Sequence, residues 1–330
     1  MNNKSEEQQI TSVCQSLIPK LQSLEDERIK IRKYTRNFWL ISLLVAGCTV
    51  CFLYMRQIAD IVTWVSTAII IVGVIVFYVL YVSGPLSKFS NRFKDEVIRA
   101  LISSFLPDSS YKPDNHVSMN EYYNSALFKN SVDRYSGKNY VEGVVDKTAV
   151  RFSELHTEYK TTTRTKNGGT QTHWHTIFQG LFMIADANKH FNARTYILPD
   201  FSQRVFGGLG KWLQKNFGDS RGQVVYLENP VFEKKFAVYT TDPVEARYLI
   251  TPQMQERMIR LADHVGGGVS ASFADGKLYL AIVKKDGLFQ LNTSPSLLNV
   301  NTLKYYANEI TDILSVVHIL DLNTRIWGKD

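Results

Sequence analysis

Two uncharged stretches decide the fold of this protein: FWLISLLVAGCTVCFLYM at residues 38–55 and IVTWVSTAIIIVGVIVFYVLYVS at residues 61–83. As α-helices they reach about 27 Å and about 35 Å, whereas the hydrocarbon core of a bilayer is about 30 Å thick. A helical hairpin buried in a soluble core is the alternative, but such helices are rarely apolar on every face. The two stretches therefore predict a pair of transmembrane helices.

The charges around these stretches predict their orientation. Only residues 56–60 separate the stretches, so the two helices form an antiparallel hairpin whose ends face one compartment. Basic residues flank those ends at Arg28, Lys30, Arg32, Lys33, Arg36, Lys88, Arg92, Lys94 and Arg99, whereas the tip has only Arg56. This excess favours both termini in the cytoplasm. We therefore expect a two-pass protein of the bacterial inner membrane.

Aromatic and cysteine residues agree with this orientation. The aromatic residues at the expected inner interface are Phe38, Trp39, Tyr78 and Tyr81. The cysteines are Cys14, Cys48 and Cys51, so residues 85–330 have no thiol for a disulfide or a nucleophile. This composition is typical of a cytoplasmic body.

Composition divides the chain into four parts. Residues 1–37 form an amphipathic, coiled-coil-like segment, and residues 38–83 form the hairpin. Residues 84–107 form an amphipathic juxtamembrane helix, and residues 108–330 form the cytoplasmic domain. The net charge of +7 is spread along the chain without a dense basic run, so no specific nucleic-acid binding is expected.

The first part has a short heptad-like stripe. Its apolar members are Ile10, Cys14, Leu17, Leu21, Leu24 and Ile31, and Arg28 occupies the remaining seam position. Pro19 is expected to start a new helix, which leaves about two heptads. The stripe packs against the protein's own body or joins copies of the chain, and the sequence leaves both open.

The juxtamembrane helix also has two interpretations. Its apolar stripe consists of Leu86, Phe89, Phe93, Val97, Leu101 and Phe105. The basic residues Lys88, Arg92, Lys94 and Arg99 lie elsewhere on the helix and can contact anionic lipid. Packing of the stripe against the following domain is the more common arrangement.

The pattern of residues 108–330 predicts an α+β domain with a largely antiparallel sheet. Ser118 and Glu121 have the spacing of a helix capping box. The sheet is expected to begin near Asn139, and the Asn167-Gly168-Gly169 turn joins two of its strands. The turns Asp275-Gly276 and Asp286-Gly287 are expected to separate three further strands. Helices are expected at about 201–216, 251–264 and 299–319.

His173 and His175 form the most suggestive chemical pair. Residues i and i+2 of a strand point to one face, so these two imidazoles can share a metal ion. Two ligands do not make a site, and an exposed or hydrogen-bonded strand pair is the other interpretation. Across the hairpin, the two histidines are expected to pair with threonines or with Lys160. No catalytic or cofactor-binding signature occurs, so we expect no cofactor.

Several short motifs together resemble a bacterial membrane-protein family known as domain of unknown function 3137. Besides the early hairpin, they are FQGL at 178–181, LEN at 227–229, FEKKFAVY at 232–239, DPVEARYLITP at 242–252, SF at 272–273 and IW at 326–327. The likeness covers roughly residues 38–327. It implies a membrane-anchored cytoplasmic domain, and it supplies no activity, cofactor or catalytic residue.

The central motifs contain a candidate partner-binding set: Phe232, Glu233, Lys234, Lys235, Phe236 and Arg247. These residues form a groove for a partner beside an exposed edge strand, or an ordinary core strand with solvated charges.

The sequence supports two functional hypotheses. The first is a membrane-anchored, non-enzymatic module that presents its α+β domain to a protein partner or to copies of itself. The alternative is a membrane-tethered, metal-dependent hydrolase that uses His173, His175 and an unidentified carboxylate. A channel is disfavoured because neither apolar stretch has an internal ionisable residue.

Overall fold

The structure is a computed structural model that describes residues 3–56, 61–164, 169–187, 191–199, 222–266 and 268–322. It divides into a helical unit, Met1–Leu101 with Leu291–Asn308, and a sheet unit, Ile102–Gln290 with Glu309–Asp330. The helix predicted at 201–216 and the motif Ile326-Trp327 lie outside the described residues, as do most of the hairpin tip and of the Asn167-Gly168-Gly169 turn.

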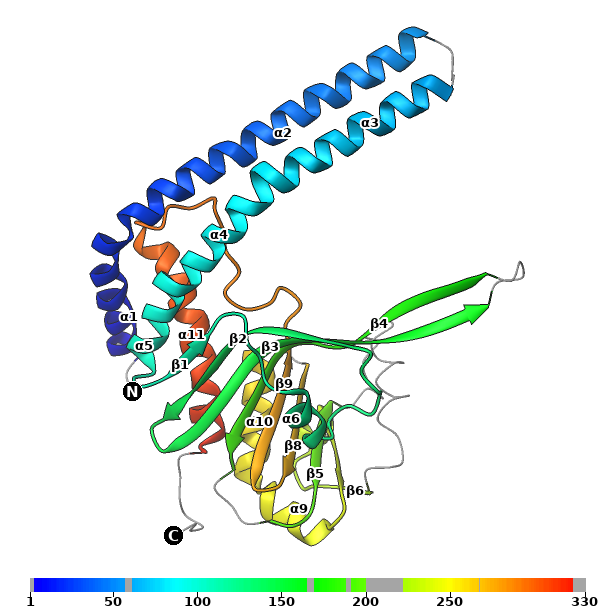
Figure 1. Cartoon of the computed structure of the whole chain (residues 1–330). Helices are drawn as coiled ribbons and strands as arrows, with labels where there is room; N and C mark the ends of the chain where they lie inside the picture. The colour runs from blue at the N-terminus through cyan, green and yellow to red at the C-terminus, as the bar shows by residue number, and fades with distance from the viewer. Residues whose placement is uncertain are drawn as a thin grey trace. The chain divides into compact units, whose positions relative to one another are not determined.

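The helical unit begins with two helices joined by a short 3-10 turn (Figure 1). Helix α1 spans Asn3–Leu17, the turn η1 spans Ile18–Leu21, and the long helix α2 spans Gln22–Arg56. Pro19 lies in the first positions of the turn, where its missing N–H group costs nothing. Pro19 therefore lies at the start of a new helical segment, as predicted, although that segment is a 3-10 turn that leads into α2.

A second helical run follows from Ile61 to Phe105. It consists of α3 (Ile61–Tyr78), a π-turn η2 (Val79–Ser83), α4 (Gly84–Phe93), a second π-turn η3 (Lys94–Ile98) and α5 (Arg99–Phe105). The N–H of Gly84 donates to the carbonyl of Val79, and this wider i→i+5 turn accommodates Pro85. The compositional boundary at 83/84 therefore falls inside a continuous helix.

The two apolar stripes of the helical unit are buried within the chain itself. In α1, η1 and α2 every member from Ile10 to Ile31 is buried, with Arg28 at 5% exposure. In the second run, Phe89, Phe93, Val97 and Leu101 are all fully buried, and the ring of Phe93 meets that of Tyr306 edge-on at 5.0 Å. Of the two interpretations left open for each stripe, the structure favours packing against the protein's own body.

The described residues of the sheet unit form nine strands, and every described pair is antiparallel. Their order is β1-β2-β3-β4-β9-β8-β5-β7-β6. The bounds are β1 Ser110–Lys112, β2 Arg134–Val145, β3 Thr148–Arg164, β4 Thr170–Asp186, β5 Thr195–Pro199, β6 Gln223–Val225, β7 Phe236–Thr240, β8 Val269–Ala274 and β9 Lys277–Val283. The predicted α+β class with an antiparallel sheet is confirmed.

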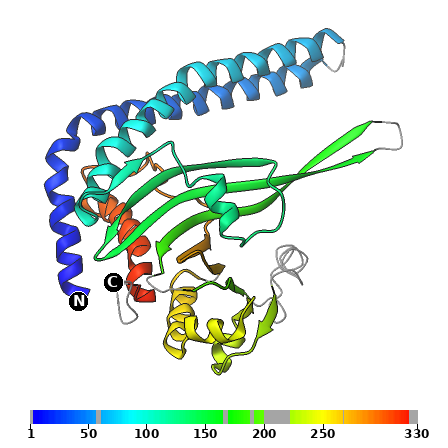
Figure 2. The ribbon, with the colours of Figure 1, turned by 60° about the horizontal axis from the view of Figure 1, so that its bottom comes forward.

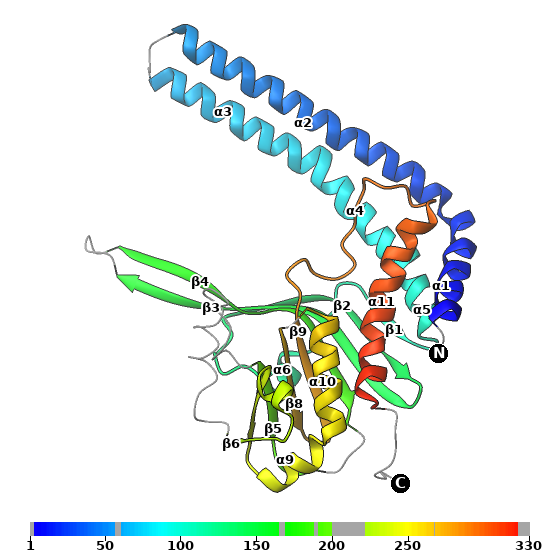
Figure 3. The same cartoon turned by 180° about the vertical axis from the view of Figure 1, so that it is seen from behind.

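Helices lie on both faces of this sheet (Figures 1 and 3). On one face lies α6, whose Tyr122 joins Phe182 and Tyr279 in a buried cluster. On the other face lie α10 and residues 309–320 of α11. The helix bounds are α6 Met119–Asn124, α8 Pro230–Glu233, α9 Pro243–Leu249, α10 Pro252–His264 and α11 Val300–Leu320. The helices predicted at 251–264 and 299–319 correspond to α10 and α11.

Local signals in this unit are confirmed in part. Ser118 and Glu121 form a complete capping box at the start of α6. The sheet, however, begins earlier than predicted, because β2 starts at Arg134 and the three-residue strand β1 pairs with it.

The prediction of a strand after Asp286-Gly287 is wrong, because the residues that follow this turn form neither helix nor strand. The N–H of Leu288 donates to Glu154 Oε2 at 2.8 Å, and the N–H of Phe289 donates to Glu309 Oε2 at 3.1 Å. Phe289 also has a φ of 52°, which lies outside the β region. The N–H groups of Leu288 and Phe289 therefore bond to carboxylate side chains and not to the backbone of a neighbouring strand.

Gly180 should be intolerant of any side chain. A Cβ atom there would lie 2.1 Å from the carbonyl oxygen of Ile282 and 2.6 Å from the nitrogen of Lys284, both in the backbone. We expect Gly180→Ala to lower the free energy of unfolding by more than about 1 kcal/mol, measured by thermal unfolding of the full chain in detergent. The control is Gly84→Ala, whose nearest neighbour is Val79 O at 3.8 Å. Equal midpoints for the two variants would contradict the packing described.

Candidate functional site: an exposed apolar hairpin and a buried polar cluster

The surface of α2 and α3 is unusually apolar. More than half of the large hydrophobic side chains that the described structure exposes lie between Trp39 and Tyr81. Leu43 is 72% exposed and Ile69 is 66% exposed. In a water-soluble helix, side chains as exposed as these are usually polar. These exposed apolar side chains occur on both helices.

One helical run, Val65–Phe105, is long and apolar enough to cross a membrane. Almost none of its most apolar stretch is buried in the structure, unlike the core helix of a soluble protein. The exposure of these side chains agrees with the length and composition of the run.

Aromatic side chains join the two helices at one level. The ring of Phe38 on α2 lies 6.1 Å from that of Phe77 and 5.2 Å from that of Tyr78 on α3. Phe77 in turn stacks on Tyr81 at 4.6 Å, and Trp39 meets Phe38 edge-on. These contacts fix residue 38 opposite residues 77–78, which is the register of an antiparallel hairpin.

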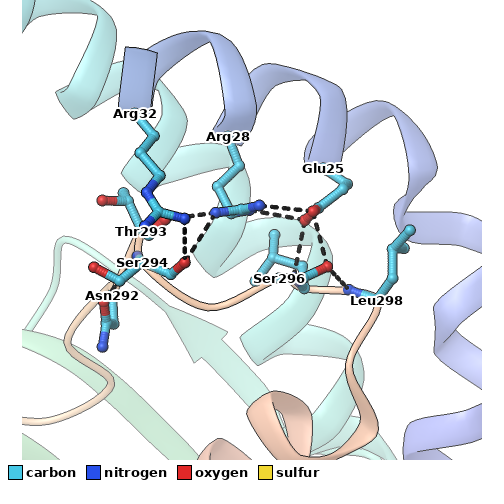
Figure 4. Close-up of polar contacts among 9 residues, drawn as sticks. Glu25, Arg28, Arg32, Asn292, Thr293, Ser294, Ser296 and Leu298 are labelled. Atoms are coloured by element: carbon cyan, nitrogen blue, oxygen red, sulfur yellow. Dashed lines mark hydrogen bonds and ion pairs between the residues drawn. The ribbon is translucent and has the colours of Figure 1, made fainter. Parts of the chain in front are cut away.

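A buried ion pair on α2 holds an irregular segment of the same unit (Figure 4). Arg28 donates to Glu25 through two parallel hydrogen bonds, from Nε at 2.9 Å and from Nη2 at 2.8 Å. Arg28 Nη1 also donates to the carbonyl of Thr293 at 2.7 Å, and Arg32 donates to that of Ser294 at 2.9 Å. We call this set, with residues 293–297, the Glu25–Arg28 cluster.

Glu25 completes the cluster from the opposite side. Its carboxylate accepts the hydroxyl of Ser296 at 2.8 Å and the N–H of Leu297 at 2.9 Å. Glu25 and Arg28 are both 5% exposed, and a charge so far from water is stable only when its bonds are satisfied. Here each oxygen of Glu25 accepts two hydrogen bonds.

These bonds determine the protonation of Glu25. Burial by itself raises the pKa of a carboxyl group. The hydrogen bonds from Arg28, Leu297 and Ser296 and the charge of Arg28 together outweigh it, and they lower the pKa of Glu25 from 4.5 to about 2. The carboxylate is therefore ionised at any physiological pH. The cluster therefore holds residues 293–297 against α2, the helix that continues into the hairpin.

Only a faint signal in the sequence pointed to this cluster. Arg28 stood out as a charged residue in an otherwise apolar stripe, but its partners lie more than 260 positions further along the chain. Glu25 has the i, i+3 spacing of a helical ion pair. Nothing in the local pattern showed that the pair would be buried.

Two of the four basic residues predicted to contact anionic lipid form ion pairs within the chain. Arg92 bonds to Glu96 at 2.8 Å and also to Glu27, and Arg99 bonds to Asp95 at 2.7 Å. Lys88 is exposed and Lys94 is half-buried. Contact with lipid headgroups through these four residues stays a prediction.

The structure places His173 and His175 on the exposed part of the β3–β4 hairpin. His173 pairs with Thr161, as predicted, but His175 pairs with Tyr159 and stacks on its ring at 4.9 Å. Lys160 instead pairs with Trp174. The described residues contain no group of three or more His, Cys, Asp or Glu side chains that could hold a metal ion. Metal binding by His173 and His175 stays a prediction.

The candidate partner-binding set divides into core and surface. Phe232 and Phe236 are buried with their rings 5.1 Å apart, so neither side chain faces a partner. Glu233 accepts the N–H of Leu227 at 2.9 Å, and Lys235 bonds to Asp263 at 2.5 Å. Lys234 and Arg247 are exposed. Any partner-binding role of this set therefore rests on its charged members and stays a prediction.

Comparison with known proteins supports the resemblance noted from the sequence. Residues 176–322 match the family described as "Protein of unknown function (DUF3137)". The matched part extends from β4 through α11, and it includes residues 293–297. The wider resemblance, over residues 38–175, stays a prediction.

One solved structure is similar at a distance. It is the crystal structure of the mycobacterial trehalose monomycolate transport factor A, TtfA, with 11% sequence identity and a TM-score of 0.32. The alignment covers 70% of this chain and 94% of that chain. So distant a likeness carries no argument about function. The comparison with curated proteins gives no match.

Removing one partner of the buried ion pair should open the cluster. In Glu25→Ala the guanidinium of Arg28 stays buried without its carboxylate, which typically costs about 3–5 kcal/mol. We expect faster proteolytic cleavage within residues 291–299 of the detergent-solubilised full chain, with cleavage sites identified by mass spectrometry. The matched control is Asp95→Ala, which breaks the exposed pair with Arg99 and should change little. The double variant Glu25→Met, Arg28→Met leaves no unpaired charge but still removes the partners of the Leu297 N–H and the Thr293 carbonyl, so it should recover only part of the protection. Equal cleavage of Glu25→Ala and Asp95→Ala would contradict the role of the cluster.

The cluster should also weaken in acid. Because folding lowers the pKa of Glu25 from 4.5 to about 2, its contribution is complete above about pH 4.5 and declines as pH falls toward 2. Over that window the native chain should lose about 3 kcal/mol more local stability than Glu25→Gln, whose side chain does not titrate. Hydrogen exchange at Leu297 measures this difference, and parallel pH profiles for the two proteins would count against it.

Proposed function

We propose that this protein is a membrane-anchored module of the bacterial inner membrane that presents an α+β domain to a protein partner or to copies of itself. In this proposal the α2–α3 hairpin crosses the membrane twice and both termini are cytoplasmic. The domain acts by binding or assembly, not by catalysis.

The exposed apolar surface between Trp39 and Tyr81 is the observation that carries this proposal. Apolar surface in water costs about 25 cal/mol of free energy per Å². Two helices that expose so many large apolar side chains to water would therefore be strongly destabilised. A bilayer removes that cost, and the backbone groups of both segments are already satisfied within their helices.

The aromatic contacts and flanking charges support the orientation. Phe38, Trp39, Tyr78 and Tyr81 lie at one end of the apolar surface, where amphipathic rings favour the headgroup region. Basic residues are concentrated just before the first apolar stretch, at residues 28–36, and just after the second, at residues 88–99. Arg92 and Arg99 keep their positive charge when paired with carboxylates, and acidic residues contribute little to this rule.

The Glu25–Arg28 cluster ties part of the family-matching sequence to the helix of the proposed anchor. Residues 293–297 belong to the part of the chain that matches the family, and they are bonded to α2. The helix that enters the hairpin therefore holds a piece of the family-matching sequence through charge-assisted bonds as well as through the covalent chain. No described residues favour the alternative metal-dependent hydrolase, which stays a prediction from His173 and His175.

A pair of matched substitutions tests the membrane anchor. Ile71 on α3 and Val144 on β2 are both 54% exposed, so in a soluble protein arginine should be tolerated at either position. In a membrane-spanning helix, arginine near the centre costs about 2.5–3.5 kcal/mol. We expect Ile71→Arg to lower the fraction of the chain in carbonate-washed membranes and Val144→Arg to leave it unchanged.

Reporter fusions at the C-terminus test the orientation of the full chain in living cells. A fluorescent reporter that matures only in the cytoplasm should be bright after Asp330, and an alkaline phosphatase fusion there should be inactive. The opposite pattern would refute the proposed topology. Recovery of the native chain in the supernatant after ultracentrifugation would refute the anchor itself.

A further inference from the structure

The strands β3 and β4 extend beyond the rest of the sheet as a two-stranded arm (Figures 1 and 2). The arm consists of residues 159–164 of β3 and residues 170–176 of β4, paired from Tyr159–His175 to Arg164–Thr170. Residues 160–164 and 170–174 are all exposed. The arm therefore has little core of its own, and an isolated two-stranded ribbon is only marginally stable in water.

A bulge directs the arm away from the sheet. Thr157 pairs with Phe178 but Glu158 pairs with Thr176, so Ile177 is an extra residue in β4. Such a bulge bends its strand and increases the local twist. The pairing of β4 with β9 begins only at Gly180, opposite Val283. Within the described structure, residues 170–176 of β4 thus have β3 as their one neighbouring strand.

The free edge of β4 lacks the charged residues and prolines that usually protect an edge strand. Residues 170–176 read TQTHWHT, with no Lys, Arg, Asp, Glu or Pro. The outer strands of the sheet, β1 and β6, are only three residues long. The opposite edge of the arm is occupied at its base, because Asp133 accepts the N–H of Lys160 at 2.8 Å and donates its own N–H to Glu158. On β3 the Asp133 contacts and the charges of Lys160 and Arg164 protect the edge, whereas residues 170–176 of β4 have no charged residue or proline.

The charge distribution of the arm suits an identical partner. Its cations, Lys160 and Arg164, lie on β3, and Arg134 beside them covers the ring of Trp174 at 4.0 Å. If two β4 edges pair, the two β3 strands lie three strand spacings apart, about 14 Å. That distance exceeds the Debye length of about 8 Å at physiological salt, so the like charges repel weakly. An acidic segment, by contrast, would find no cation on the β4 edge itself.

We propose that two copies of this chain associate by antiparallel pairing of residues 170–176 of β4, which joins their arms into a four-stranded ribbon β3-β4-β4-β3. Backbone hydrogen bonds supply the attraction, and threonine, histidine and Trp174 side chains pair across the new interface. The inference rests on the assembly role under the proposed function and names its partner, a second copy. It does not depend on the membrane anchor.

A cysteine scan tests the pairing and its direction. In an antiparallel pair related by a two-fold axis, only a residue at the axis faces its own copy, with Cα atoms about 4.5–5.5 Å apart, within the range that a disulfide spans. The parent is the full chain with Cys48→Ala and Cys51→Ala, which keeps the buried Cys14. Single cysteines are placed at each position from 170 to 176 and, as controls, at 161 to 163 on β3.

Mild oxidation of native membranes should give a disulfide-linked dimer at one β4 position or two adjacent ones, and little at the β3 positions. Equal crosslinking along both strands indicates random collision and overturns the proposal. Crosslinking that is even along β4 indicates parallel pairing and overturns it as well, as does the lack of any dimer above the Cys14 parent.

A matched charge substitution provides the second test. Thr162 and Thr172 are direct cross-strand partners, both exposed, so lysine at either should affect the folded monomer equally. Thr172→Lys places like charges at the β4 interface and should weaken self-association in detergent by about tenfold, whereas Thr162→Lys should have little effect. Equal dimer fractions for the two variants would overturn the proposal. Both variants should stay in the membrane fraction, so a failure of pairing is distinct from a failure of the anchor.

Discussion

The irregular segment between β9 and α11 depends on charged side chains for its backbone hydrogen bonds. Residues 284–299 form neither helix nor strand, yet they bury Leu288, Phe289 and Leu297. Buried N–H and C=O groups must find partners. In the sheet unit Glu154 and Glu309 provide them, and in the helical unit Glu25, Arg28 and Arg32 provide them. Without these charged groups the segment would have to unfold into water.

This dependence explains why a buried ion pair occurs in a stripe that otherwise follows a heptad rule. A leucine in place of Arg28 would continue the apolar stripe but would leave the carbonyls of Thr293 and Ser294 without the hydrogen bonds that Arg28 donates. The two hydrogen bonds between Arg28 and Glu25 offset the free-energy cost of removing both charges from water. The stripe therefore serves the fold of a single chain, whereas the uncharged edge of β4 is the feature suited to assembly.

Much of the architecture was predictable from local patterns. The apolar hairpin, the capping box at Ser118, the helices α10 and α11 and the antiparallel sheet all follow from hydrophobic periodicity and turn residues. The strand after Asp286-Gly287 was predicted wrongly because the same turn signal that ends β9 was interpreted as a hairpin. No local rule shows that the carboxylates of Glu154 and Glu309 would capture the next two N–H groups. The short strand β1 was missed because three residues carry almost no pattern.

The sequence by itself determined which part of the chain is long and apolar enough to suggest a membrane anchor, since the length and polarity of residues 38–83 are properties of the residues alone. It also determined the strand and helix types of the sheet unit, because side-chain period is local. Only the tertiary structure decided that Phe232 and Phe236 belong to the core and that Glu25 and Arg28 are buried together with residues 293–297. It alone showed that β4 extends past its neighbour β9. Those outcomes depend on contacts between segments that are far apart in the sequence, and the local pattern of residues does not specify such contacts.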